Sequence, residues 1–259
     1  MPIVTALSIT AVKATRLHVV DRVVLTSAGV RENRRFYLVD ERDRMINSKI
    51  EGALQTVVAD YSDADRRLKL TFPDGHTVED EVRLGEPVNT RFFSLQKGAR
   101  LVEGPWAAAV SEHVGRTLRL VEGGEEGGVD RGADGAVSLI SRASLARLAE
   151  VGGLESLDPR RFRMLVEIDG VDAHAEDGWV GNGSVRIGDA VVAFSGHVGR
   201  CLITGRDPDT GVVDVPTLDI LGSYRADVET TEPLPFGVWG RVVKPGSVAV
   251  GDEVAPLDG

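Results

Sequence analysis

The chain has 259 residues, of which 42% are hydrophobic and 27% charged, and its formal net charge is −10 at pH 7. This composition is typical of a folded globular protein with one large or two modest domains, and it excludes a disordered or fibrous chain. The single cysteine, Cys201, excludes an internal disulfide, a cysteine zinc finger and the ligand set of an iron–sulfur cluster.

The negative charge is unevenly distributed. Residues 1–95 hold 14 basic and 14 acidic side chains, whereas residues 96–259 hold 16 and 26. Because phosphate backbones and anionic lipids require a broad positive surface, we expect neither nucleic acid nor a membrane as a partner. The first residues form no basic leader and no apolar run reaches the length of a membrane span, so the expected location is the cytoplasm.

The first part of the chain alternates short β-branched segments with turn residues. The turn Pro73-Asp74-Gly75 is a strong hairpin signal. We expect a small sheet that curls on itself, because closure removes exposed edges, and this gives a β-barrel-like domain over residues 1–95. Its expected strands cover residues 5–13, 35–40, 44–47, 54–61, 66–72 and 76–82.

Residues 96–259 mix helical and strand periods and form the second predicted domain. A helix is expected over residues 105–114 and another after Ser141, a good N-cap residue. The Gly-rich acidic stretch 122–135 is expected to be a loop. Further strands are expected over residues 116–121, 138–140, 162–168, 190–195 and 200–204. The predicted fold class is therefore mainly β with a few helices (α+β).

Motifs of the common nucleotide and zinc enzymes are missing. Gly181-Asn182-Gly183 begins like a dinucleotide fingerprint, but the third glycine is absent and strand-like residues follow. The sequence has no P-loop, HExxH or GxSxG, and its five histidines are scattered. These observations disfavour NAD, ATP and zinc.

Cys201 admits two interpretations. A lone cysteine in a strand is most often a small buried hydrophobic residue. Alternatively, the flanking Arg200 and Arg206 favour a thiolate, the form that attacks electrophiles or binds soft metals. A nucleophilic pair with His197 would require the backbone to fold back, because four residues of extended strand span about 13 Å.

Three basic residues lie in or beside apolar segments. Lys13 ends the first expected strand, Arg35 precedes the run Phe36-Tyr37-Leu38-Val39, and Arg163 falls within another strand. Because a buried cation needs an anionic partner, these residues together with a thiolate are suited to an anionic, metal-bearing cofactor. Arg160 and Arg161, in contrast, are interpreted as a solvated basic rim.

An ordered set of motifs carries a family resemblance. The motifs are Ala11-Val12-Lys13, Arg35-Phe36-Tyr37-Leu38-Val39, Leu139-Ile140-Ser141-Arg142-Ala143-Ser144-Leu145, Phe162-Arg163, Glu176-Asp177-x-Trp179, Ile187-Gly188-Asp189, Arg200-Cys201-Leu202-Ile203-Thr204, Asp207-Pro208-Asp209-Thr210-Gly211 and Val250-Gly251-Asp252. The chain resembles the family built from an N-terminal β-barrel domain and a MOSC β-barrel domain, here residues 1–95 and 96–259. That family includes the mitochondrial amidoxime-reducing component and bacterial reductases of N-hydroxylated bases.

The resemblance implies a molybdenum cofactor (Mo-molybdopterin), with Cys201 as the metal ligand and catalytic residue. It further implies that Lys13, Arg35 and Arg163 hold the pterin and its phosphate, with Arg200 and Thr204 beside the metal ligand. Trp239 stands where the family has a cofactor-contacting tyrosine, and Gly205 replaces the second of two threonines.

The function implied is reduction of a small N-hydroxylated or N-oxygenated compound. Since one cysteine cannot hold an iron–sulfur cluster, electrons must come from a separate reductase or ferredoxin-like protein. Two alternatives stay open: a non-redox carrier of the cofactor or of sulfur, and a metal-free enzyme that uses Cys201 as a nucleophile.

Overall fold

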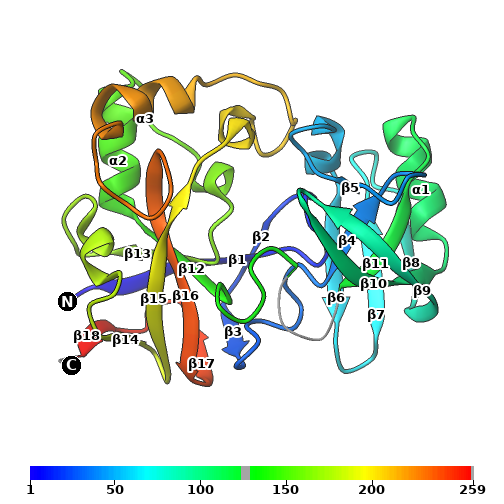
Figure 1. Cartoon of the computed structure of the whole chain (residues 1–259), viewed down its shortest axis with the longest axis horizontal. Coiled ribbons are helices and arrows are strands. Elements are labelled where there is room, and N and C mark those ends of the chain that lie inside the picture. The colour runs from blue at the N-terminus through cyan, green and yellow to red at the C-terminus, as the bar shows by residue number, and fades with distance from the viewer. Residues whose placement is uncertain (124–128, 258–259) are drawn as a thin grey trace.

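The strands of the protein fall into two groups that lie side by side in the computed structural model (Figure 1). The structure describes residues 1–123 and 129–257, so part of the predicted acidic loop, residues 124–128, lies outside the described residues. Strands dominate and the helices are few, which confirms the predicted α+β class.

The first group is an eight-stranded sheet in the order β18-β14-β15-β16-β12-β13-β1-β2, with the pair β17-β3 beside it. Its strands are β1 (Ile3–Ile9), β2 (His18–Val20), β3 (Arg22–Leu25), β12 (Val137–Ser141), β13 (Val166–Asp169), β14 (Ser184–Ile187), β15 (Ala190–Gly199), β16 (Pro235–Lys244), β17 (Gly246–Ala249) and β18 (Val254–Leu257). The Val4 amide donates to the Asp252 carbonyl (2.9 Å) and the Gly251 amide to the Val4 carbonyl (2.8 Å). The sheet therefore curls until β1 meets the segment before β18.

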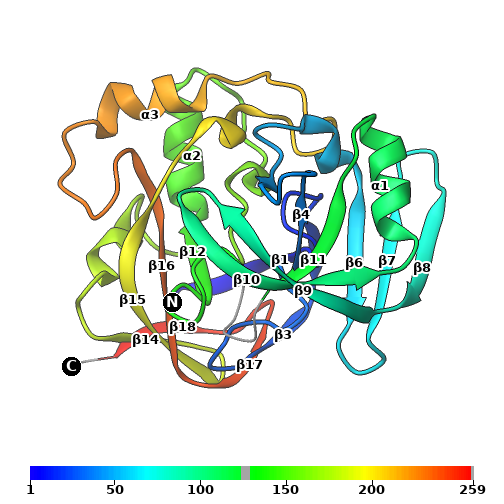
Figure 2. The ribbon, with the colours of Figure 1, turned by 45° about the vertical axis from the view of Figure 1, so that its right-hand side comes forward.

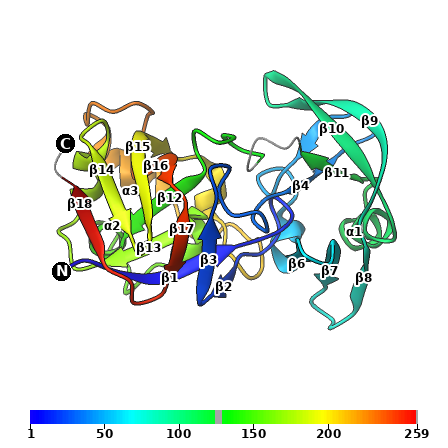
Figure 3. The same cartoon turned by 90° about the horizontal axis from the view of Figure 1, so that it is seen from below.

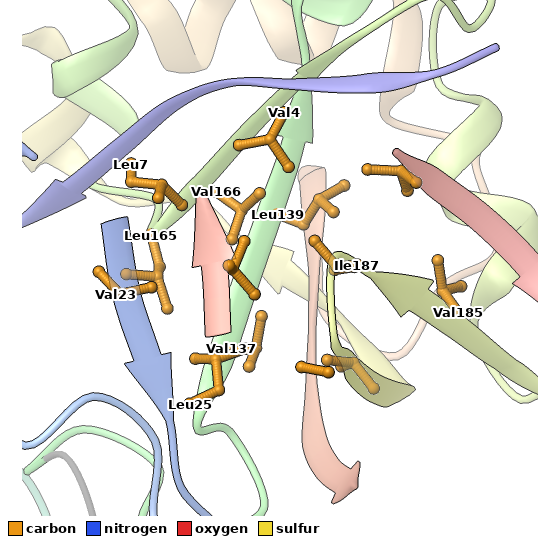
Figure 4. Close-up of a cluster of buried hydrophobic side chains, with 14 of the residues drawn as sticks. Val4, Leu7, Val23, Leu25, Val137, Leu139, Leu165, Val166, Val185 and Ile187 are labelled. Carbon is orange, nitrogen blue, oxygen red and sulfur yellow. The ribbon is translucent and has the colours of Figure 1, made fainter. Parts of the chain in front are cut away.

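The interior of this curled sheet holds the larger hydrophobic core. Side chains on one face of its strands point inward, among them Val4, Leu7, Val166 and Ile187 (Figure 4), and the irregularity between Val4 and Ala6 puts Leu7 on the same face as Val4. Alternation with a period of two is what a sheet with one buried face requires.

Two short helices close one end of the sheet. They are α2 (Arg142–Val151) and α3 (Thr217–Arg225), and Leu148 and Leu221 pack between them and the strands. Ser141 caps α2 by accepting a hydrogen bond from the Ser144 amide (3.1 Å), as its sequence predicts. Within the described residues, no helix has the length and hydropathy needed to cross a membrane.

The second group combines a five-stranded sheet, β5-β4-β11-β10-β9, with a three-stranded sheet, β6-β7-β8. Helix α1 covers it (Figure 2). The elements are β4 (Phe36–Val39), β5 (Met45–Ile46), β6 (Val58–Ser62), β7 (Arg67–Thr71), β8 (Thr77–Glu81), β9 (Arg83–Phe92), β10 (Leu95–Glu103), α1 (Trp106–Val114) and β11 (Arg119–Gly123). The Gly75 amide donates to the Phe72 carbonyl (2.9 Å), so the predicted turn does form a hairpin between β7 and β8.

Several predicted strands begin later than expected, because four short 3₁₀ turns occupy chain that was assigned to strands or loops. These turns are η1 (Gly52–Thr56), η2 (Pro159–Phe162), η3 (Ala175–Trp179) and η4 (Leu202–Gly205). The strands predicted over residues 54–61 and 162–168 are therefore wrong in their first residues, and the strand predicted over residues 200–204 is wrong throughout.

The grouping of strands bears on the two predicted domains. Strand β1 lies in the same sheet as β12 to β16, and residue 95 lies at the turn of the β9–β10 hairpin. The division at residue 95 stays a prediction, but these pairings place the first strand with the C-terminal group and β10 and β11 with the N-terminal group.

Trp106 anchors the second group and supplies a test of its core. The side chain is buried, and its indole N–H donates to the Leu68 carbonyl (2.9 Å). Replacing it by alanine removes an aromatic ring and leaves a buried acceptor, so Trp106→Ala should lower the free energy of unfolding by about 3–5 kcal/mol. Chemical denaturation measures this, with Val24→Ala on the exposed face of β3 as the control. A loss no larger than that of the control would contradict the role given to Trp106.

Candidate functional site

Cys201 lies two residues after the end of β15, and its thiol is exposed. Its backbone is extended, but the chain then enters η4 instead of continuing as a strand. The Thr204 amide and hydroxyl both donate to the Cys201 carbonyl (3.1 and 3.0 Å), and this local bonding competes with strand pairing. The exposed thiol excludes the interpretation of Cys201 as a buried hydrophobic residue.

The loop after η4 is held by its own carboxylates. Asp207 Oδ1 accepts hydrogen bonds from the Asp209 amide (3.0 Å) and the Thr210 amide (2.8 Å). Arg160 binds both oxygens of Asp209 (2.9 and 2.8 Å). Arg161, paired in the same way with Asp214, is only 6% exposed, so the prediction that it belongs to a solvated rim is wrong.

The same loop touches the second group of strands. Gly211 has a left-handed backbone and lies directly on the backbone of Gly52, where a Cβ on either residue would collide with the other. On the same side, Arg206 donates to the carbonyls of Gly211 (2.6 Å) and Lys49 (3.2 Å). Arg206 therefore joins the two groups and does not point at the thiol.

Three cations gather around one carboxylate where the two groups of strands meet. Lys13 Nζ forms an ion pair with Asp130, and Arg34 Nη1 lies 3.3 Å from the other oxygen of Asp130. Arg34 also donates to the Arg163 carbonyl, and Arg163 donates to the Thr15 carbonyl (2.8 Å). We call Lys13, Arg34, Arg163 and Asp130 the cation cluster.

Widely separated segments build the cation cluster. Lys13 follows β1, Arg34 precedes β4, and Asp130 precedes β12 in the segment that passes between the two groups (Figure 3). Arg163 ends η2 in a left-handed conformation, so it does not lie within a strand as expected.

Loss of hydration shifts the pKa values of the charged groups in the cation cluster. Desolvation lowers the pKa of Lys13, and it lowers the pKa of Arg163 to about 9 with a further contribution from Arg34. Burial alone would raise the pKa of Asp130, but Lys13 and Arg34 outweigh it and hold that pKa well below its ordinary value. Three positive charges against one negative charge leave the cation cluster with an excess of positive charge.

Arg200 adds a fourth cation next to the thiol. Its guanidinium donates to the carbonyls of Phe162 and Phe236 (both 2.8 Å) and to the Met164 sulfur (3.1 Å). Burial lowers the pKa of Arg200 to about 9, while the neighbouring Cys201 acts in the opposite direction. Within the described residues, no carboxylate forms an ion pair with Arg200.

Two other predicted site residues have different surroundings. Trp239 donates its indole N–H to the His197 carbonyl (3.0 Å), and the Arg131 guanidinium lies 4.8 Å from its ring. Arg131 in turn binds both oxygens of Glu232 (2.6 and 3.0 Å). Thr204 bonds Thr217 at the start of α3 (2.5 Å), so its hydroxyl fixes the Cys201 loop to that helix.

Arg35 lies in a separate network. It pairs with Glu122 and with Asp63 (3.1 Å), and it lies 5.5 Å from the centre of the Tyr61 ring. Arg34 and Arg200 donate to the adjacent carbonyls of Arg163 and Phe162, which links the cation cluster to Arg200, whereas the Arg35 side chain lies in another network.

Sequence reasoning missed Arg34 and Asp130 as site residues. Arg34 belongs to a group of arginines, Arg31, Arg34 and Arg35, whose clustering suits a small anionic ligand, but the resemblance selects Arg35 from this group. Asp130 carries no local signal, because it is one of several carboxylates within the acidic stretch 122–135 and lies 117 residues from its partner Lys13.

The MOSC domain family model matches residues 121–255, and the chain belongs to this family. Among curated proteins it is similar to human mitochondrial amidoxime reducing component 2, at 39% identity over 100 residues, which cover 36% of this chain and 29% of the relative. It is also similar to human mitochondrial amidoxime-reducing component 1, at 36% identity over 124 residues, which cover 45% and 35%. The matched segments thus span about a third of these relatives.

Among solved structures, the YUAD protein from Bacillus subtilis matches 98% of this chain and 94% of its own, with 13% identity and a TM-score of 0.45. YiiM from Escherichia coli matches 54% and 59%, with 16% identity and a TM-score of 0.36.

The cation cluster predicts an anion-dependent stability. Asp130→Asn keeps the volume but leaves Lys13, Arg34 and Arg163 without a counter-charge, so the free energy of unfolding should fall by about 3–5 kcal/mol. Added inorganic phosphate should restore part of this loss. Thermal unfolding with and without phosphate measures both effects, and Asp134→Asn, at an exposed position nearby, is the control. Equal stability of the two variants would contradict the arrangement.

Proposed function

We propose that the protein is a molybdenum-cofactor oxidoreductase that reduces small N-hydroxylated or N-oxygenated compounds. The observation that carries the proposal is the exposed Cys201 thiol next to Arg200, together with a group of half-buried cations that outnumber their carboxylates. Family membership and the names of the curated relatives support it.

The donor set fits an anionic, metal-bearing cofactor. A thiolate is a soft ligand suited to a transition metal, and guanidinium groups suit phosphate. Cys201 would bind the metal, while Lys13, Arg34, Arg163 and Arg200 would hold the pterin and its phosphate. The cofactor contact that the resemblance implies for Arg35 is untested, and because Arg35 pairs with Glu122 and Asp63, we propose Arg34 in that role instead.

When bound, the cofactor supplies a redox centre that exchanges two electrons and accepts oxygen. Cleavage of the N–O bond consumes two electrons and two protons and yields the amine and water, so the electrons must come from a separate donor. The residues of this chain contribute in other ways. The cations balance the charge of the cofactor, and Thr204 holds the loop that orients the Cys201 thiol.

The metal-free nucleophile is the weaker alternative. It needs a base at the thiol, but the His197 ring is turned towards the Thr231 amide (3.5 Å from Nδ1) and Asp177 (4.0 Å from Nε2). In the carrier alternative the same residues bind the cofactor, but the protein reduces no substrate.

The first test removes the proposed metal ligand. Cys201→Ala, purified from a host that makes the cofactor, should lose bound molybdenum and reductive turnover of a hydroxylamine, because no other thiolate is available. Elemental analysis and dye-driven turnover measure both. Full retention of metal and turnover would refute the assignment; metal without turnover in the unaltered protein would favour the carrier, and a reactive thiol without metal the nucleophile.

A second test separates two arginines. Arg163→Gln should lower the amount of bound cofactor at least about tenfold, because it removes a charge-assisted contact worth roughly 1.5–3 kcal/mol. Arg35→Gln should retain the cofactor, since Arg35 belongs to another network. Molybdenum content and released pterin fluorescence measure retention, and thermal unfolding checks that both variants fold. The opposite ranking would show that Arg35 contacts the cofactor.

A further inference from the structure

Two adjoining hollows lie on the surface of the second group of strands. Their volumes are about 390 and 480 Å³, and Arg44 and Arg91 line both. Arg42 belongs to the first hollow, and Lys49 and Arg116 belong to the second. We call this continuous region the basic hollow.

The basic hollow is positive although the chain carries a net charge of −10. Five of its lining residues are cations, and two are carboxylates, Asp40 and Asp43. Asp40 forms ion pairs with Arg44 (2.8 Å) and Arg116 (3.5 Å), and Asp43 forms an ion pair with Arg119.

Three of these cations are available to a partner. Arg42, Lys49 and Arg91 are exposed, and none pairs with a carboxylate within the described residues. The positive charge of the basic hollow is therefore not neutralised by the chain itself.

Exposed apolar side chains lie among these charges. Phe93, at the turn between β9 and β10, is 60% exposed, and Ile50 is 53% exposed. Both line the second hollow together with Arg91 and Lys49. An exposed aromatic ring bordered by arginines is the composition of a protein docking surface.

The basic hollow adjoins the candidate site from two directions. The Phe93 ring packs edge-to-face on Phe92 (5.2 Å between centroids), and Lys13 Nζ of the cation cluster lies 5.6 Å from the Phe92 centroid. Through the loop after the thiol, Arg206 donates to the Lys49 carbonyl (3.2 Å). A partner seated in the basic hollow would therefore lie beside the segment that carries Cys201.

We infer that the basic hollow is the docking surface for an acidic electron-carrier protein. This inference rests on the proposed function, which requires a separate donor. The cation cluster is half-buried and compact and suits a small anion, whereas Arg42, Lys49 and Arg91 are exposed and spread across the surface. Exposed charges of this kind steer a charged macromolecule and speed its association.

The test measures binding without turnover. The probe is a small acidic [2Fe–2S] ferredoxin carrying a fluorescent label, and anisotropy gives its Kd for the full-length protein at low and high salt. Because such a ferredoxin carries one electron, it must dock twice for each two-electron turnover. Arg42→Glu/Arg91→Glu should raise the Kd at least about tenfold, and salt should weaken binding to the unaltered protein.

The matched control reverses two exposed arginines elsewhere. Arg22→Glu/Arg241→Glu makes the same change in net charge on β3 and β16 and should leave the Kd within about twofold of the unaltered protein. Equal weakening in both double variants, or no binding of the ferredoxin to the unaltered protein, would overturn the inference. So would a dimer in sedimentation that only Arg42→Glu/Arg91→Glu dissociates, since the surface would then belong to a second copy of the chain.

Dye-driven turnover separates the two proposals. Reduced methyl viologen needs no docking surface, so both double variants should keep the activity of the unaltered protein with this dye. If dye-driven turnover is absent while ferredoxin binding depends on Arg42 and Arg91, the proposed function fails and the docking surface stands.

Discussion

The excess of half-buried positive charge around Asp130 is the constraint on which the rest of the structure depends. Lys13, Arg34 and Arg163 come from three distant segments, and each loses hydration where the two groups of strands meet. A single carboxylate cannot offset three desolvated cations, so this junction is poorly balanced until an anion binds. Binding of such an anion would therefore stabilise both the site and the contact between the two groups.

The Cys201 thiol is exposed because the backbone around it makes its hydrogen bonds with other groups. Thr204 occupies the Cys201 carbonyl, and carboxylates of the following loop bind Arg160 and Arg161. Within the described residues, the Cys201 side chain forms no hydrogen bond or ion pair, so its sulfur is free to bind a ligand. A rigid loop that presents a free sulfur atom is suited to holding a metal in a fixed orientation.

The sequence predicts which types of side chain form the site better than it predicts which of them lie next to one another in space. Charge among apolar residues indicates Lys13 and Arg163, and the flanking arginines and the family resemblance indicate Cys201 with Arg200. Arg34 was passed over for Arg35 because adjacent side chains near a strand start point in different directions, which only the backbone decides. The β9–β10 hairpin was missed because its residues are largely exposed and lack the alternation of a half-buried strand.

The contact between Gly52 and Gly211 sets how closely the two groups of strands approach beside the thiol. Neither residue has a side chain, so the two backbones meet without a spacer. A methyl group at either position would clash with the opposite backbone and push the loop after Cys201 away from the second group. The position of the loop that follows Cys201 is thus fixed by two residues that lack side chains and lie far apart in sequence.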